Sequence, residues 1–164
     1  MREQLEIAAA KVLRKYLGDN RALFDKIEFS EKQIEISLGD GVSVNGRIDL
    51  VRRIDTGETT IVDLKSSARS QAEEVTETQL HIYALGYQEL TGRRPDYVEI
   101  YELDEGKRKP RSVDDDFLDD VKVDVRRAAQ ALRTSSLPAA PAVKKCAACD
   151  YLGMCTAGRA ATPN

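Results

Sequence analysis

The sequence predicts an α/β fold, a mixed central sheet of about four to five strands flanked by helices. Three observations lead to this prediction. Apolar and polar residues alternate over residues 34–38 and 42–54, which is the period of a half-buried strand. A third strand-like segment, 59–65, follows after a turn. A helical pattern over 71–90 then leads to the strand-like segment 97–103, and a strand–helix–strand crossover of this kind joins parallel strands.

The composition limits the class of protein. The chain has 164 residues, of which 41% are hydrophobic and 32% charged, so it can build one substantial core. No apolar run approaches the roughly 20 residues that a membrane span needs, so we expect no membrane contact. The net charge of −3 gives no global signature of nucleic-acid binding, which would have to depend on a local basic patch. The three cysteines are clustered near the C-terminus rather than spread as a disulfide framework, and we expect a reducing, cytoplasmic setting.

The first elements are a helix and two strands. The helix is expected over about residues 2–17, with Gly18 and the two residues after it ending the pattern. In the second strand Gly46 interrupts the apolar row, and a glycine inside a strand often marks a close approach or a bend. Asp49 has the opposite parity, so we expect it on the other face. The apolar row is expected to comprise Val42, Val44, Ile48 and Leu50.

The turn between the second and third strands predicts their register. A three-residue loop of Asp55, Thr56 and Gly57, with the glycine in the left-handed region, pairs Ile54 with Glu58. Counting back from that pair sets Asp49 directly opposite Asp63, with Cβ atoms about 4.5–5.5 Å apart. Lys65 shares the face of Asp63, two residues further along the strand. Two carboxylates this close repel each other, and a divalent cation would remove that cost.

The remaining elements complete the organisation of the chain. A short basic strand over 107–111 is expected at a sheet edge because Pro110 cannot donate to a ladder. Asp114, Asp115 and Asp116 are expected to cap a helix over 116–133. The segment 134–143 contains Ser-Ser and two prolines and is typical of a linker. We therefore divide the chain into a core over 1–133 and a linker with a cysteine-rich tail over 134–164.

The helix over 71–90 has an unusual inward face. Gln79 lies in the middle of this face, where a buried amide needs hydrogen-bond partners. His81 points roughly 160–200° away from Gln79 around the helix, so we expect it at the surface. The inward stripe is expected to comprise Val75, Gln79, Tyr83, Tyr87 and Leu90.

The facing aspartates and the nearby lysine suit metal-assisted hydrolysis of phosphodiesters. Carboxylates hold Mg²⁺ or Mn²⁺ through oxygen while the ion keeps several waters. Such an ion polarises a phosphate and activates water, and Lys65 would orient that water and offset charge on the phosphate. The competing interpretation is that Asp49, Asp63 and Lys65 form ordinary surface ion pairs.

Three motifs resemble those of the PD-(D/E)XK nucleases, in the branch that includes RecB, AddB and Cas4. They are Gly46-Arg47-Ile48-Asp49, Ile61-Val62-Asp63-Leu64-Lys65 and Gln79-Leu80-His81-Ile82-Tyr83. The spacing Cys146-x2-Cys149-x5-Cys155 is similar to the C-terminal iron–sulfur segment of many members. The resemblance covers about residues 30–156.

The resemblance implies a restriction-endonuclease-like fold and a nuclease that cleaves DNA from an end or on single strands, in DNA repair or recombination. It implies that Asp49, Asp63 and the backbone carbonyl of Leu64 hold Mg²⁺ or Mn²⁺. Lys65 matches the catalytic lysine of the family. Gln79 and Tyr83 match the helix motif that positions DNA, although core packing alone would also explain Tyr83.

The sequence departs from the family pattern in two places. Members usually carry a metal-binding histidine on an upstream helix and a first cysteine far upstream, whereas the one histidine here is His81. We therefore expect the chain to be the C-terminal portion of a longer protein, with a helicase fused upstream or in complex. The cysteines would then hold a [4Fe–4S] cluster whose fourth ligand lies outside this chain. Zinc or free thiols are the alternatives.

Two other classes of function stay open from the sequence. The chain could be a catalytically inactive DNA-binding or scaffolding module of the same fold within a helicase complex. A small zinc-ribbon interaction domain would explain the cysteine tail but not the strand motifs.

Overall fold

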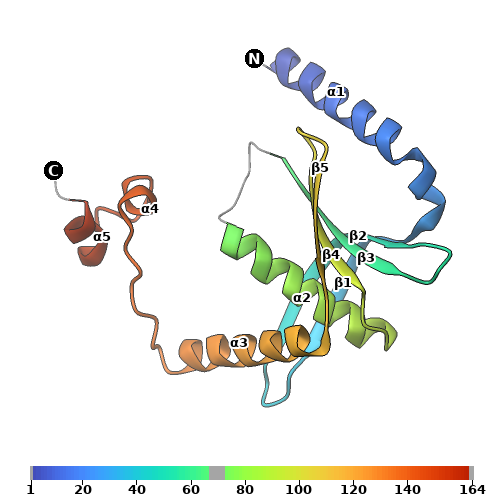
Figure 1. Ribbon diagram of the computed structural model, residues 1–164. Helices are drawn as coiled ribbons and strands as arrows, with labels where there is room; N and C mark the ends of the chain where they lie inside the picture. The colour runs from blue at the N-terminus through green and yellow to red at the C-terminus, as the bar shows by residue number, and fades with distance from the viewer. Residues whose placement is uncertain (1, 67–72, 163–164) are drawn as a thin grey trace. The chain divides into compact units, whose positions relative to one another are not determined.

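The computed structural model describes residues 2–66 and 73–162 (Figure 1). The strands are β1 (Ile27–Ser37), β2 (Ser43–Arg53), β3 (Thr59–Lys65), β4 (Tyr97–Glu102) and β5 (Lys107–Ser112). The helices are α1 (Arg2–Asn20), the 3₁₀ helix η1 (Arg21–Lys26), α2 (Glu73–Thr91), α3 (Asp115–Arg133), α4 (Val143–Ala147) and α5 (Thr156–Ala161).

The strands form one mixed sheet in the order β1-β2-β3-β4-β5. β2 pairs antiparallel with both β1 and β3, β3 pairs parallel with β4, and β4 pairs antiparallel with β5. α2 makes the crossover between the parallel strands (Figure 1). The predicted fold class is therefore confirmed, and so is the position of the strand that contains Pro110, because β5 is an edge of this sheet.

The sheet has a different hydrophobic cluster on each face. The larger cluster packs the sheet against α2 and the beginning of α3, and its buried members include Ile48, Ile61, Leu80, Ala84 and Leu118. On the other face Leu50, Val62 and Tyr101 are buried together, with Tyr16 of α1 packed against them. The rings of Tyr16 and Tyr101 meet edge to face with centroids 5.1 Å apart. Asp63, Lys65, Gln79 and Tyr83 lie on the α2 side of the sheet.

The apolar row that was predicted for β2 is broken. Ile48 belongs to the cluster on the α2 face, whereas Leu50 belongs to the cluster on the opposite face. The register of β1 with β2 sets Glu31 opposite Asp49, and Glu31 has a φ of +51°. A side-chain-bearing residue in the left-handed region disrupts regular alternation, as bulges do beside functional sites. Asp49 therefore lies on the same side of the sheet as Ile48. The prediction from strict alternation, which put Asp49 on the face opposite Ile48, was wrong.

Two element boundaries also differ from the prediction. α1 continues through Gly18 to Asn20, since the buried Asn20 side chain donates to the carbonyl oxygen of Tyr16 at 2.8 Å and holds the last turn. β1 begins at Ile27, well before the alternating segment 34–38, because it pairs with almost the whole of β2. The beginning of the helix predicted over 71–90 lies outside the described residues. At α3 the cap was predicted correctly, since Asp114 accepts from the N–H of Phe117 at 2.8 Å.

The chain divides into two compact units, one reaching to Arg126 and one from Arg127 to the end, so the division falls within α3. The first unit contains the sheet. The second contains the remainder of α3, a stretch without helix or strand from Ser136 to Ala142, and the short helices α4 and α5. In the described part of the chain, no helix has the length and hydrophobicity that crossing a bilayer requires.

Candidate functional site

The hairpin between β2 and β3 has the predicted register. The N–H of Ile54 donates to the carbonyl oxygen of Glu58 at 3.0 Å, and Gly57 in the loop has a φ of +89°. The ladder pairs Leu50 with Val62, and one further step along the same register sets Asp49 opposite Asp63. The two carboxylates interact electrostatically, since Asp49 contributes to the raised pKa of Asp63. The arrangement therefore brings the two acidic side chains together.

Asp63 is buried in an environment that disfavours its charge. Only 1% of the residue is exposed, and its Oδ2 atom has no hydrogen-bond partner of good geometry among the described residues. Burial raises the pKa of Asp63, the neighbouring ammonium of Lys65 lowers it, and the charge of Asp49 raises it further. The Lys65 ammonium is 3.0 Å from Oδ2 and forms an ion pair with it. A divalent cation at Oδ2 would add to the compensation that Lys65 provides.

Asp49 is oriented by the backbone of the neighbouring strand. Its Oδ2 atom accepts a hydrogen bond from the N–H of Leu64 at 2.9 Å. This bond ties the side chain to the segment between Asp63 and Lys65. A carboxylate held by a backbone donor loses little further freedom when it binds an ion.

A chain of hydrogen bonds connects Lys65 to α2. The ammonium of Lys65 donates to Oε1 of Gln79 at 2.9 Å, and Nε2 of Gln79 donates to the hydroxyl of Tyr83 at 2.6 Å. Tyr83 packs over Gly46, where a Cβ atom would lie 3.3 Å from Cε1 of the ring. The amide on the inward face of α2 thus has a partner on each side, and Gly46 marks the close approach that its position in the strand suggested.

The pKa of Tyr83 links the same groups electrostatically. Burial raises the pKa of its hydroxyl most, the hydrogen bond from Gln79 lowers it, and the charges of Asp49 and Asp63 raise it. Arg47 lowers it by a smaller amount. The Tyr83 hydroxyl therefore interacts electrostatically with both carboxylates. This agrees with Asp49 and Asp63 lying on the face of the sheet that α2 covers.

An open cavity of about 490 Å³ lies beside this group of residues. Gln79, Tyr83 and Gly46 form part of its lining, so the cavity borders the hydrogen-bond chain that ends at Lys65. Its other lining residues are Val44, Asn45, Thr78 and Ile82. A volume of this order suits a small group such as one nucleotide of a longer substrate.

The residues present suit a hard divalent cation. Asp49 and Asp63 offer carboxylate oxygens, and Asp63 has a buried oxygen without a hydrogen-bond partner of good geometry among the described residues. No group of three His, Cys, Asp or Glu side chains that could hold an ion is found among those residues. Mg²⁺ is commonly held by one or two carboxylates with several waters, so two carboxylates are a sufficient donor set.

The cysteines lie in the second unit. Cys146, Cys149 and Cys155 are free thiols, and Sγ of Cys155 accepts from the N–H of Gly158 at 3.3 Å. No three-residue metal group is formed by them or by any other described residues. The iron–sulfur cluster therefore stays a prediction.

Two features were not foreseen from the sequence. His81 is half-buried rather than at the surface, and its ring lies 4.1 Å from that of Phe117 at the beginning of α3. The sequence prediction was wrong because it placed no helix against that side of α2. Arg47, next to Gly46, forms an ion pair with Glu31 at 3.0 Å close to the site. Its position within the Gly-x-x-Asp motif was the one signal that could have identified it.

A mixed sheet with an aspartate facing an Asp-x-Lys sequence at its central hairpin has the arrangement of a nuclease fold. The chain belongs to the PD-(D/E)XK nuclease superfamily, whose family model matches residues 1–156. No curated protein sequence matches the chain.

Two crystal structures have a similar fold. That of the protein SSO0001 is 19% identical with a TM-score of 0.56, and the match covers 92% of this chain and 70% of the other. That of a candidate exonuclease from Eubacterium rectale is 13% identical with a TM-score of 0.53, covering 90% of this chain and 59% of the other. At these identities the likeness is one of fold.

Proposed function

We propose that this chain hydrolyses phosphodiester bonds of DNA with the help of Mg²⁺ or Mn²⁺. The observation that carries the proposal is the buried Asp63, which faces Asp49 and has an oxygen without a directed hydrogen bond next to Lys65. Membership of a nuclease superfamily supports the reaction class. The name of the Eubacterium rectale structure supports attack from a DNA end.

The roles follow from the chemistry of each group. Asp49, Asp63 and the backbone carbonyl of Leu64 would hold the ion, which when bound polarises the phosphate and increases the acidity of water. Lys65 has donors to orient the attacking water and to offset the negative charge that develops on the phosphate. Gln79 and Tyr83 hold Lys65 and border the cavity where the nucleic acid would lie.

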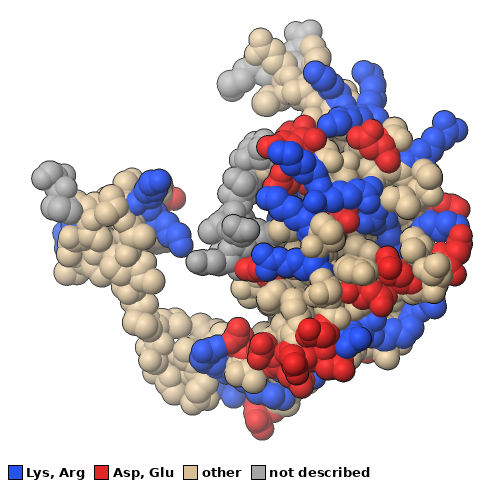
Figure 2. All heavy atoms as spheres, in the orientation of Figure 1, with Lys and Arg blue, Asp and Glu red and all other residues tan. Residues whose placement is uncertain are grey.

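Basic side chains near the sheet edge support an anionic substrate. Figure 2 shows Lys and Arg gathered over β5, and acidic side chains along the beginning of α3. Several of the basic residues have acidic partners, for example Lys109 with Glu102 at 2.7 Å and Arg111 with Glu77. The patch is therefore partly neutralised, and we expect modest DNA affinity that falls as salt is added.

Calorimetric titration of the metal-free chain with Mn²⁺ tests the proposal. We expect binding that disappears in Asp63→Ala and persists in the control Asp55→Asn, which removes an exposed carboxylate in the hairpin loop. A labelled single-stranded oligonucleotide should be cleaved in the presence of Mn²⁺, and at least about 100-fold more slowly by Lys65→Ala. Binding of Mn²⁺ that is unchanged in Asp63→Ala would overturn the assignment.

We further place the chain in the RecB, AddB and Cas4 branch, with a helicase as its partner and a role in repair or recombination. The three motifs and the cysteine spacing support this placement. Cys146, Cys149 and Cys155 would contribute three ligands to a [4Fe–4S] cluster and stabilise the tail. Iron and sulfide analysis of protein prepared without oxygen, with and without the rest of the reading frame, is the test.

A catalytically inactive DNA-binding or scaffolding module is the second candidate. It is favoured by the absence, from this sequence, of the upstream histidine that related nucleases use as a further metal ligand, because the one histidine here is His81. DNA binding by the wild type without any Mn²⁺ binding, also in the longer protein, would support this candidate over the enzyme.

A further inference from the structure

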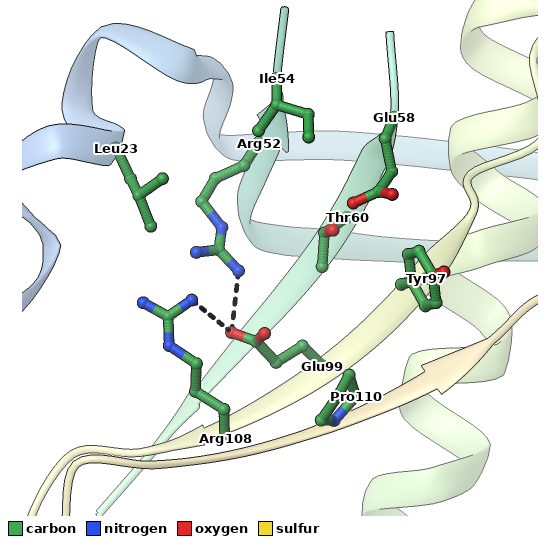
Figure 3. A pocket seen from close by; sticks show the side chains of 9 residues that line it. All are labelled: Leu23, Arg52, Ile54, Glu58, Thr60, Tyr97, Glu99, Arg108 and Pro110. Atoms are coloured by element: carbon green, nitrogen blue, oxygen red, sulfur yellow. Dashed lines mark hydrogen bonds and ion pairs between the residues drawn. The ribbon is translucent and has the colours of Figure 1, made fainter. Parts of the chain in front are cut away.

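A second cavity lies on the sheet face opposite Asp63, Lys65 and α2. Its volume is about 310 Å³, and it opens between η1 and the strands (Figure 3). The residues that carry charge are Arg52, Glu58, Glu99 and Arg108. The walls include Leu23, Ile54, Tyr97 and Pro110. None of these residues has a part in the proposed nuclease site.

Two guanidinium groups converge on one carboxylate in this cavity. Nη2 of Arg52 lies 2.8 Å from Oε1 of Glu99, and Nη1 of Arg108 lies 3.9 Å from the same oxygen. Figure 3 shows Arg52 and Arg108 extending toward each other with the end of the Glu99 side chain between them. The pair of Arg52 and Glu99 is deeply buried, with 9% and 6% of the side chains exposed. The buried carboxylate of Glu99 thus interacts with the guanidinium groups of both Arg52 and Arg108.

Two arginines and two carboxylates line the cavity, so its formal charges balance. Glu58 and Arg108 are both exposed, so water and salt screen their charges, whereas Arg52 and Glu99 are buried. Nε of Arg52 is buried and has no hydrogen-bond partner among the described residues. A buried, charged donor without an acceptor is costly, and an anion in the cavity would supply one.

Arg108 is held in place before any ligand arrives. It donates to Oδ1 of Asn20, and its guanidinium lies 5.5 Å from the ring centroid of Tyr101. Asn20 is itself buried, and its amide also donates to the Tyr101 hydroxyl at 3.3 Å. A guanidinium fixed in this way loses little freedom on binding an oxyanion, for which its planar fork is well suited.

A buried salt bridge alone does not account for this arrangement. The pairing of Arg52 with Glu99 needs neither the second arginine nor the open volume beside it. Apolar walls next to the guanidinium groups are what a compact ring or aliphatic group requires, and Thr60 adds a hydroxyl to the lining.

We infer that this cavity binds a small molecule that carries one oxyanion group, a carboxylate or a phosphate, on a compact apolar body. Arg52 and Arg108 bind the oxyanion, while Leu23, Ile54 and Tyr97 contact the body. The inference does not depend on the nuclease proposal, because the two sites share no residue.

Titration of the whole chain with three ring compounds tests the inference by calorimetry and by NMR of the arginine Nε–H groups. The probes are phenyl phosphate, benzoate and the neutral benzyl alcohol. We expect one of the two anions to bind with a Kd below about 1 mM and to shift the Arg52 signal, and benzyl alcohol to bind at least about tenfold more weakly. The two anions distinguish a phosphate ligand from a carboxylate ligand.

Two variants test the location. Arg108→Gln should weaken anion binding at least about tenfold, and Leu23→Trp should block it by filling the cavity without changing its charge. Lys109→Gln is the matched control, since it removes a cation from the same strand but does not line the cavity. Thermal unfolding verifies that each variant is folded. The inference would be overturned if neither anion bound the wild type. It would also be overturned if the folded variants Arg108→Gln and Leu23→Trp bound the anion as tightly as the wild type does.

Discussion

Lys65 donates to Oε1 of Gln79 at 2.9 Å, and this contact joins the end of β3 to α2. The same ammonium lies 3.0 Å from Oδ2 of Asp63. The ammonium is therefore oriented by one hydrogen bond, to Gln79, and by the charge of Asp63, and an ammonium has three donors to offer. A further donor can thus serve another partner. In the proposed reaction that partner is the attacking water or the phosphate.

The first prediction concerns this contact. Gln79→Leu removes the acceptor from Lys65 and the donor to Tyr83, and we expect kcat on DNA to fall about 10–100-fold, the range typical when an orienting partner is lost. Gln79→Glu keeps an acceptor for Lys65 and should retain more of kcat than Gln79→Leu. Gln130→Leu, at an exposed position of α3, is the control. An unchanged kcat in Gln79→Leu would show that Lys65 does not need this partner.

The second prediction concerns the contact of Gly46 with Tyr83. A methyl group at residue 46 would lie 3.3 Å from the Tyr83 ring, so the ring must shift by a few tenths of an ångström, whereas its 3.5 Å distance from Ile34 is an ordinary contact. We expect Gly46→Ala to destabilise the fold by about 1 kcal/mol and to displace Tyr83 from Gln79. Gly18→Ala is the matched control, because nothing lies within 4 Å of a Cβ at that helical position. Thermal unfolding of both should show a loss for Gly46→Ala and a small gain or no change for Gly18→Ala.

The third prediction is that the charge of Asp63 lowers the stability of the metal-free protein but is needed for metal binding. Its pKa is raised in the folded protein, chiefly by burial, so the stability that this group contributes is greatest below pH 3.8 and is lost as the pH rises through the folded pKa. Asp63→Asn removes this loss, and we expect it to stabilise the metal-free protein at pH 7 by about 1 kcal/mol, the order of relieving one unsatisfied buried polar group.

Thermal unfolding with and without Mn²⁺ measures both sides of this trade. The gain in Asp63→Asn should shrink toward pH 3, and the increase of Tm that Mn²⁺ produces in the wild type should vanish. Asp55→Asn should show neither effect. A decrease of stability at pH 7 in Asp63→Asn would mean that the pairing with Lys65 outweighs the cost of burial.

The fourth prediction uses the single histidine. Burial lowers the pKa of His81 below its usual 6.5, so the unfolded chain binds a proton more readily. The stability that the neutral ring provides is therefore complete above about pH 6.5 and is lost as the pH falls through the folded pKa. The NMR titration of the His81 ring should have its midpoint below 6.5, and His81→Phe should lessen the decrease of Tm over this range. A midpoint at or above 6.5 would contradict the burial against Phe117.

The hairpin was the most predictable part of the site. Its loop contains a glycine at the one position where φ is positive, and that local requirement determines the register that pairs Leu50 with Val62. The partnership of Gln79 was predictable in kind, since a buried amide must find hydrogen bonds. Which groups it would bind depended on the crossover that lays α2 across the sheet.

What could not be predicted depends on contacts between distant parts of the chain. The break between Ile48 and Leu50 occurs opposite Glu31, whose positive φ has no signature in the sequence. His81 is buried by Phe117 of α3, which no helical period reveals. In the sequence, Arg52 and Glu99 look like ordinary polar residues of two separate strands. Their buried ion pair could not be predicted, because it depends on the parallel pairing that brings both to one face of the sheet.

The parallel pairing of β3 with β4 also determines when the site is completed during folding. Asp49 and Asp63 are joined by a tight hairpin, which closes on the scale of microseconds. The helix that restrains Lys65 reaches its place only with the longer-range crossover, and such non-local contacts form more slowly. The acidic pair thus needs only a short loop to close, whereas the anchoring of the amine needs the long crossover.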